Sequence, residues 1–468
     1  MSVIAVEEYS TGTESVAISE AGGDRPREAI RWFTLAIAAL AVSGVLSLVL
    51  VVGRVPVISS LLIHDPEFAR RCLVVHVNLA ISVWVYAFLA GLFRLLPARQ
   101  SLIPPSIALG CATLGTIGLT FSVFLPSGTP ITSNYIPALD HGLFCAALAL
   151  FAVGIVLSFM DGRLFSRPRN TDFIPAGAHA ALLMTVPAFV LALLTIAGSW
   201  YRGDPTGDPE VYFERLFWGG GHVLQVVNTL GLLLSWLILL RLLIQHTTFS
   251  RQIAVPLFGV MLLPIAFGPW ITFGGHSPHW FTRMMEFGLF PVTLIILIVG
   301  AASLWLRRSR VARDDLLTPG FIGLVTSVAM TLAGFVLGAM ITTDTTLIPA
   351  HYHANIGAVT VAYMAVLLSL LPRLGSPLPW PRVTAWQPLF YGVGQMVFVI
   401  GLAVAGTLGQ ASRKTYGVQQ QINTTSEQTG LIIVGIGGIL AFGGGVHFIV
   451  VMVRAALHAR REKLETPH

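Results

Sequence analysis

Twelve long apolar runs constrain this 468-residue chain more than any other feature of its sequence. The hydrocarbon core of a bilayer is about 30 Å thick, and an α-helix of about 20 apolar residues crosses it. Charged residues make up 11% of the chain and hydrophobic residues 54%, whereas about a quarter of the residues in a soluble domain are charged. The sequence therefore predicts an all-α, polytopic membrane protein, a twelve-transmembrane-helix bundle in a lipid bilayer. The expected spans are residues 30–53, 70–93, 103–125, 138–160, 178–199, 221–244, 252–274, 284–306, 319–341, 348–371, 386–408 and 430–453.

Composition divides the chain into three parts and orients it in the membrane. Residues 1–29 form a polar N-terminal arm, residues 30–453 the twelve-helix domain, and residues 454–468 a basic tail. Basic residues in short loops mark the cytoplasmic side of a membrane, and the arm, the even-numbered loops and the tail hold 20 of the 28 Lys and Arg residues. We expect both termini in the cytoplasm and the protein in a prokaryotic cytoplasmic (inner) membrane. The net charge is +6, but the basic residues are distributed according to membrane side, so this charge does not indicate nucleic-acid binding.

Histidines gather at one depth of the predicted bundle. His351 and His353 lie two residues apart at the outer end of span 348–371. Over two residues a helix turns by about 200° and rises by about 3 Å. These side chains are therefore expected to leave opposite faces of one helix, which could bind a metal centre on either side. Four further histidines fall at the same outer level, in or beside spans II, VI, VII and VIII: His76, His222, His276 and His279.

The chemistry of this layer favours transition metals. Ionisable side chains within membrane spans are costly and mark functional sites by default. Several imidazoles with almost no thiols suit haem iron, copper or non-haem iron better than calcium or magnesium, and zinc is chemically possible. Each histidine alone also has a plainer interpretation, since His76 could hydrogen-bond a carbonyl group and His276 could be solvated. The number of histidines at one level favours a cofactor site.

The ordered histidines resemble those of subunit I of the haem-copper oxidase superfamily, which includes cytochrome oxidases and nitric oxide reductases. A histidine in span II, one in span VI, one at the end of span VII and His-x-His in span X occur in this order, and the resemblance covers all twelve spans. It implies that His76 and His353 are the axial ligands of a low-spin, b-like haem. It also implies that His351 is the proximal ligand of a high-spin haem.

The same resemblance implies a second metal and a site for haem propionates. Copper or non-haem iron would bind His222 and His276, with His279 as a further candidate ligand. Arg413 and Lys414 follow span XI and resemble the basic pair that holds haem propionates in the family. Two cations at the outer surface would neutralise carboxylates that emerge from haems in the outer layer. The alternative is an ordinary basic loop.

The sequence departs from the family pattern near the second metal. Members usually have adjacent histidines at the end of span VII, whereas His276 and His279 are three residues apart here. Oxygen-reducing members often carry a tyrosine four residues after the span VI histidine, and that position is Val226. Glu286 is the only carboxylate of span VIII and resembles a buried glutamate of nitric oxide reductases, which favours NO over O2 as the substrate. Its alternative role is that of a helix N-terminal carboxylate paired with Arg283.

The expected function is that of a respiratory oxidoreductase that passes electrons from the low-spin to the high-spin haem, where a diatomic gas binds. The products would be N2O from NO or, as the alternative, water from O2. No C-x-x-C-H motif occurs, so any c-type haem would belong to a partner. We expect an electron-donor subunit, a small cytochrome or a cupredoxin on the outer face. A non-catalytic haem-binding sensor or assembly protein and a twelve-span transporter stay open, although we detect no internal repeat.

Overall fold

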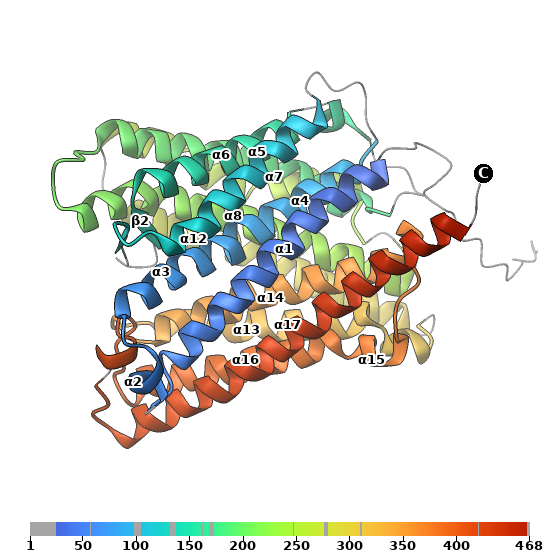
Figure 1. Ribbon diagram of the computed structural model, residues 1–468. Coiled ribbons are helices and arrows are strands. Elements are labelled where there is room, and N and C mark those ends of the chain that lie inside the picture. The colour runs from blue at the N-terminus through green and yellow to red at the C-terminus, as the bar shows by residue number, and fades with distance from the viewer. Residues whose placement is uncertain are drawn as a thin grey trace, which may run out of the picture.

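The computed structural model describes ten segments of the chain, and within them long helices run side by side through one bundle (Figure 1). The described residues are 25–56, 58–97, 104–131, 137–160, 162–167, 173–246, 248–275, 279–308, 311–419 and 421–465, without the side chains of residues 25, 279–290 and 460–465. The helices are α1 (Arg25–Val52), α2 (Ile58–Leu62), α3 (Pro66–Val77), η2 (Asn78–Val83), α4 (Trp84–Leu95), α5 (Pro105–Phe121), η3 (Ser122–Phe124), α6 (Gly142–Phe159), η4 (Gly162–Phe165), α7 (Ala176–Arg202), α8 (Pro209–Ile244), α9 (Arg251–Gly259), α10 (Leu262–Ile265), α11 (Gly268–Gly274), α12 (His279–Leu306), η6 (Asp314–Leu317), α13 (Pro319–Ala339), α14 (Leu347–Leu370), η7 (Leu371–Leu374), α15 (Pro381–Ala385), α16 (Gln387–Thr407), η8 (Gly417–Gln419) and α17 (Thr425–Glu465).

Helix length and composition confirm an all-α, polytopic membrane fold. Eleven helical segments of the described chain are long and apolar enough to cross a membrane, and they match eleven of the expected spans. The remaining span, expected at 284–306, lies in α12, of which the apolar part Pro291–Leu306 is described. The expected span 252–274 consists of α9, α10 and α11 in succession. The basic tail expected at 454–468 continues α17 as a helix as far as Glu465.

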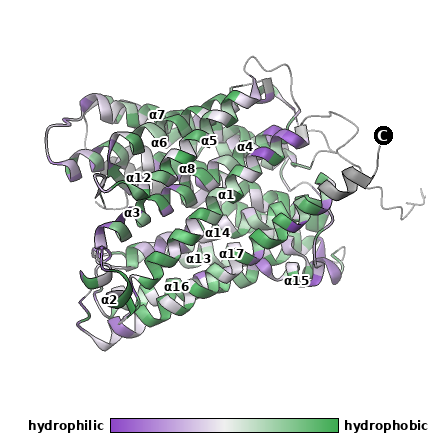
Figure 2. Ribbon diagram, in the orientation of Figure 1, coloured by the Kyte–Doolittle hydropathy of each residue, from purple (hydrophilic) through white to green (hydrophobic). Residues whose placement is uncertain are grey.

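Both ends of the described chain lie at the same end of the bundle, as an even number of spans requires. In Figure 1, α1 begins and α17 ends at the right, whereas α2 and the short hairpin lie at the left. The hairpin pairs β1 (Thr129–Ile131) with β2 (Ala138–Asp140) in antiparallel register. We call the end with α2 the outer end and the other the inner end. Figure 2 shows hydrophobic residues along the middles of the helices and hydrophilic residues at both ends, as a bilayer demands.

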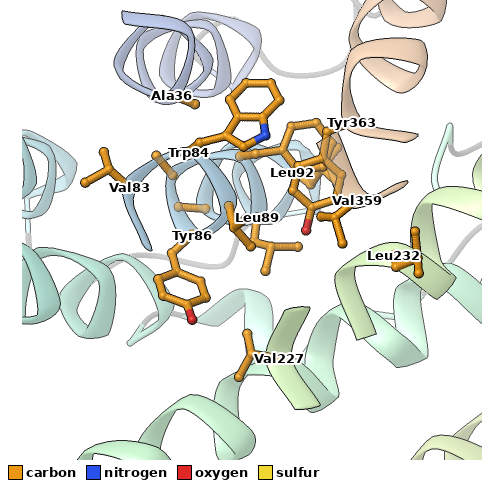
Figure 3. Close-up of a cluster of buried hydrophobic side chains, with 14 of the residues drawn as sticks. Ala36, Val83, Trp84, Tyr86, Leu89, Leu92, Val227, Leu232, Val359 and Tyr363 are labelled. Carbon is orange, nitrogen blue, oxygen red and sulfur yellow. The ribbon is translucent and has the colours of Figure 1, made fainter. Parts of the chain in front are cut away.

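The centre of the bundle consists of α8, α14 and the helical run α3–η2–α4. About 83% of the apolar stretch is buried in each of α8 and α14, so these helices are enclosed by protein. An aromatic cluster joins α4 to α14 (Figure 3), in which the Tyr363 ring stacks on Phe88 with 3.7 Å between ring centroids. The centroid of the Trp84 ring lies 5.9 Å from that of the Tyr363 ring. The spans that carry His76, His222 and the pair His351 and His353 are therefore the most enclosed of the described membrane-spanning helices.

Two of the helices, α16 and α17, pack backbone to backbone at glycines. A Cβ added at Gly437 would lie 2.1 Å from the backbone nitrogen of Phe398, and one at Gly394 would lie 2.3 Å from that of Ala441. Small residues permit such close approach between membrane helices. The ring of Phe398 lies 4.7 Å from the His353 ring, so this glycine contact also positions the wall beside one expected haem ligand.

Replacing Gly437 with alanine is expected to force the two helices apart. The added methyl group has backbone in its way rather than a movable side chain, and overpacking of this kind costs about 1–3 kcal/mol. Thermal unfolding of the detergent-solubilised protein measures the loss. Gly443→Ala is the control, because its Cβ would meet the Phe390 ring at 3.7 Å, an ordinary contact. Equal melting temperatures for the two variants would contradict the prediction.

Candidate functional site

A large cavity runs between the helices from the outer end of the bundle, at Arg54 and Lys414, past its middle to Tyr391 and Ile449. Its volume is about 770 Å³, within the range of about 300–1,000 Å³ found for ligand and cofactor sites. Most of the lining side chains are apolar, and His76, His351 and His353 are among the exceptions. The cavity extends from Ser43 of α1, past both histidines of α14, to Asn228 of α8. The two histidines of the His-x-His motif therefore border one continuous space that surrounds their helix.

Residue His76 lies near the end of α3, directly before the π-helical segment η2. Single π-helical turns within α-helices are frequent at functional sites. The Nδ1 atom of His76 lies 2.9 Å from the carbonyl oxygen of Ser43 in α1. A carbonyl oxygen can only accept, so Nδ1 carries the hydrogen and Nε2 carries the lone pair. The Ser43 hydroxyl donates to the His76 carbonyl oxygen at 3.0 Å, which further ties α1 to this turn.

A neighbouring helix holds His351 in the same way. Its Nδ1 lies 2.8 Å from the carbonyl oxygen of Gly334 in α13, which again leaves the lone pair on Nε2. A Cβ added at Gly338, one turn further along α13, would lie 2.7 Å from the imidazole. Glycine at this position therefore lets the α13 backbone approach the ring. The Asn355 amide donates to the His351 carbonyl oxygen at 3.1 Å.

The third imidazole of this kind, His222, is buried in α8. Its Nδ1 lies 2.7 Å from the carbonyl oxygen of Trp218, one turn earlier on the same helix. His222 is not one of the residues that line the cavity, but Gly221 and Gln225 beside it are. The structure thus brings His76, His351 and His353 together around the cavity and leaves His222 in the wall behind it.

These histidines fit a haem or metal site. Histidines that bind metals usually donate their other ring N–H to a carbonyl or carboxylate group, which fixes the tautomer and the ring orientation. His76, His222 and His351 all have this arrangement with a backbone carbonyl. His353 borders the cavity and packs against the Phe398 ring. Each expected haem ligand is thus positioned in the cavity wall by a contact with another helix.

Cations surround the outer mouth of the cavity. Arg413 and Lys414 line it, as expected from the sequence, and Arg413 forms an ion pair with Asp344. Arg54, from the turn after α1, lines the same mouth. It donates to the carbonyl oxygen of Arg413 at 2.7 Å and to the hydroxyl of Tyr416 at 2.8 Å. Its guanidinium group lies over the Tyr416 ring, 4.3 Å from the centroid.

Arg54 is the residue of this site that sequence reasoning missed. It is 6% exposed, and within the described chain it has no carboxylate partner. A buried cation is costly unless an anion balances it. The sequence signal was an arginine at the outer end of a span, on the side that carries few basic residues. The mouth of the cavity is therefore suited to anionic groups such as carboxylates.

The expected site of the second metal falls mostly outside the described residues. His276 is one of the residues that the structure does not describe, and α12 begins at His279, where the side chains of His279 and Glu286 are likewise outside the description. Among the described side chains, no three of the His, Cys, Asp and Glu type gather closely enough to hold a metal ion. The second metal stays a prediction from the sequence.

Fold and cavity together define a polytopic membrane protein that encloses a histidine-lined cavity. The family model described as "Cytochrome C and Quinol oxidase polypeptide I" matches residues 27–440. The chain belongs to this family, subunit I of the haem-copper oxidases, which confirms the resemblance of the histidine pattern. It is an oxidoreductase of a superfamily that contains haems together with a copper or iron site and that works with other subunits and electron donors. This membership excludes the transporter alternative.

Comparisons with individual proteins agree with the family. A protein from Aquifex aeolicus (strain VF5) is 29% identical over 349 residues, which cover 74% of this chain and 84% of the relative. Protein RP382 of Rickettsia prowazekii (strain Madrid E) is 25% identical over 507 residues, which cover 93% and 97%. Both are described as uncharacterized. A haem-copper terminal oxidase dimer solved by cryo-EM has a TM-score of 0.72 at 16% identity, covering 93% of this chain and 84% of that one, a likeness in fold.

Proposed function

We propose that this protein is the catalytic subunit of a respiratory complex that reduces a diatomic gas inside the outer half of the membrane. The observation that carries the proposal is the shared geometry of His76 and His351, whose Nδ1 atoms are held by carbonyl groups of neighbouring helices at the wall of one cavity. Such geometry presents Nε2 to a metal in a fixed direction. When bound, two haems and a second metal supply electron transfer and the binding of the gas.

In this proposal the histidines have distinct roles. His76 on α3 and His353 on α14 would hold the low-spin, b-like haem, and His351 would hold the high-spin haem. His351 and His353 share α14 and line the same cavity, so the two haems that they would hold would be neighbours, and together these groups would supply electron transfer. His222 and His276, with His279 as a further candidate, hold copper or non-haem iron beside the high-spin haem.

The cations at the mouth bind the haem carboxylates. Arg413 is already paired with Asp344, so Arg54 and Lys414 supply the positive charge that is not balanced within the described chain. Charge-assisted hydrogen bonds to carboxylates are about twice as strong as neutral ones. These residues would therefore bind haem carboxylates at the outer end of the cavity, and an electron-donor subunit, a small cytochrome or a cupredoxin would dock on the same outer face.

We favour NO as the substrate, reduced as 2 NO + 2 e⁻ + 2 H⁺ → N2O + H2O. Val226 stands four residues after His222, where O2-reducing members often have a tyrosine. Glu286 on α12 is the carboxylate that would bind the second metal or supply protons. The orientation proposed for the chain, with both termini in the cytoplasm of a prokaryote, is supported by the sequence, which has 20 of its 28 Lys and Arg residues in the arm, the even-numbered loops and the tail.

The test is the carbon monoxide difference spectrum of the dithionite-reduced complex, together with haem and metal content per chain. We expect two haems, one of which binds CO, and one further metal. Iron as the second metal, with faster turnover of NO than of O2, supports NO reduction, whereas copper with faster turnover of O2 supports the alternative O2 + 4 e⁻ + 4 H⁺ → 2 H2O. A complex without a CO-binding haem would contradict the proposal and favour a haem-binding sensor.

A further inference from the structure

Two buried polar groups that line the cavity inward of the histidine layer lack hydrogen-bond partners among the described residues. They are the hydroxyl of Tyr86 in α4 and the amide oxygen of Asn228 in α8. Tyr86 is 3% and Asn228 6% exposed, and both residues line the cavity. Figure 3 shows the Tyr86 hydroxyl pointing toward Val227, the residue before Asn228. The Tyr86 hydroxyl is therefore directed toward the segment of α8 that carries Asn228.

Such groups are suited to internal water. Leaving a buried hydroxyl or carbonyl group unpaired costs about 1–3 kcal/mol. Buried waters typically make about three hydrogen bonds, mostly to polar groups that otherwise have no partner. The cavity offers the space, and Gln225, Thr229 and Thr293 also border it. A water that donates to Asn228 and exchanges a hydrogen bond with Tyr86 would satisfy both orphaned groups.

This polar end of the cavity lies inward of the histidine layer. Tyr86 comes ten residues after His76 along the same span, which is about 15 Å of helix. Asn228 comes six residues after His222, or about 9 Å. Further inward, the enclosed faces of α4, α8 and α14 are apolar, with Phe88, Leu89, Leu233 and Met364 fully buried. Tyr86 and Asn228 are thus the polar lining groups of α4 and α8 inward of the histidine layer, and Thr360 and Tyr391 continue the polar lining on α14 and α16.

The reaction needs a proton source at this place. Reduction of either gas consumes one proton for each electron, and Val226 removes one tyrosine that could supply it. We propose that Tyr86 and Asn228 hold internal water and that the Tyr86 hydroxyl, through this water, is the proton donor of the gas-reducing site. This role rests on the proposed function, whereas the water site does not.

The transfer can be written so that charges balance. The O–H bond of Tyr86 breaks as its proton joins the bound water, and a file of further cavity waters passes a proton outward, from one water to the next, to the oxygen atom of the gas as it is reduced. Asn228 accepts a hydrogen bond from the water and orients it. Tyr86 changes no electrons, because these arrive at the gas from the external donor. Its phenolate is then protonated again by a proton from bulk water, which reaches it as a hydronium ion along the same file of waters from the cavity mouth and leaves water behind.

A second tyrosine provides a matched control. The Tyr363 hydroxyl is also without a hydrogen-bond partner among the described residues and is fully buried. It lies against α8 at Gly231, where an added Cβ would be 2.0 Å from the hydroxyl oxygen. Tyr363 does not line the cavity. Tyr363→Phe and Tyr86→Phe therefore remove the same atom from equally enclosed positions, only one of which borders the cavity.

The first measurement is a single turnover of the fully reduced complex, mixed separately with dissolved NO and O2 after photolysis of CO. We expect Tyr86→Phe to slow the proton-consuming phase by about 100-fold or more, the usual contribution of a positioned acid, with an unchanged CO difference spectrum. Asn228→Leu should slow the same phase, and Tyr363→Phe should stay within about twofold of the wild type. Wild-type rates in Tyr86→Phe, with the CO-binding haem present, would overturn the donor role.

The second measurement is a cryo-EM map of the wild-type complex at a resolution that shows water. We expect water density within hydrogen-bonding distance of both the Tyr86 hydroxyl and the Asn228 amide oxygen, and none beside the hydroxyl in a map of Tyr86→Phe. A dry cavity end in the wild type would overturn the water site. If the wild type has no CO-binding haem, the proposed function and the donor role both fail, and the map alone decides the water site.

Discussion

His351→Gln is expected to abolish CO binding while the low-spin haem stays in place. The substitution removes the imidazole that Gly334 orients toward the cavity, and no other described histidine approaches that position from α13 or α14 except His353, whose ring packs against Phe398. Loss of a residue that only hydrogen-bonds to a metal ligand weakens metal binding by about 10–100-fold. Loss of the ligand itself should therefore weaken binding by more than this. The CO difference spectrum per chain measures the change.

The control for this variant is His447→Gln. His447 is half-buried in α17, and it does not line the cavity although its neighbour Val446 does. It should retain both haems and the CO signal. If His351→Gln binds CO like the wild type, the high-spin haem has another ligand and the assignment of His351 is wrong. If both variants lose CO binding, the histidine changes act through the stability of the bundle.

The fold could be predicted because the bilayer leaves few choices. A chain in hydrocarbon must satisfy its backbone hydrogen bonds within each segment, so apolar runs of sufficient length have to be helices. What the sequence did not predict are the irregularities within the spans. The π-helical segment η2 after His76 has no distinctive amino-acid composition that would predict it. The span 252–274 contains prolines, but the sequence does not indicate at which residues they divide it into three helices. Both depend on packing against neighbouring helices.

The candidate site was predictable to the extent that its chemistry is carried by side chains. His76, His351 and His353 could be placed at one depth by counting residues, and the structure puts all three on one cavity. The groups that orient His76 and His351 could not be predicted. They are the backbone carbonyl oxygens of Ser43 and Gly334, and every residue of the chain has such an oxygen. They become partners only when α1 and α13 pack beside these rings.

Residues with an ordinary structural role elsewhere were the hardest to recognise. Arg54 could have been an interfacial anchor at the end of a span, since arginine is common there. Tyr86 lies in an apolar run where an aromatic ring usually belongs to the core. Both became candidates because the structure shows what they lack: a carboxylate near the Arg54 guanidinium and a hydrogen-bond partner for the Tyr86 hydroxyl, each within the described chain.

Arg54→Gln is expected to weaken haem retention strongly without unfolding the protein. Glutamine can still donate to the Arg413 carbonyl oxygen or the Tyr416 hydroxyl, which Arg54 contacts, but it brings no positive charge to the mouth. Removing one partner of a buried ion pair costs about 3–5 kcal/mol, which corresponds to about 100-fold to about 4,000-fold in affinity. The rate at which haem transfers from the reduced complex to excess apomyoglobin measures the loss, with haem content per chain as the end point.

The control for the mouth is Arg70→Gln, which removes an equal charge from the same outer end. Arg70 forms an ion pair with Glu67 and donates to the Gln419 side chain at 2.7 Å, and it does not line the cavity. Its loss should change haem transfer by less than about threefold, as exposed ion pairs contribute about 0–1 kcal/mol. Equal effects of the two variants would mean that the cations act through the general field of the outer face, and Arg54 would then have no specific role in binding haem carboxylates.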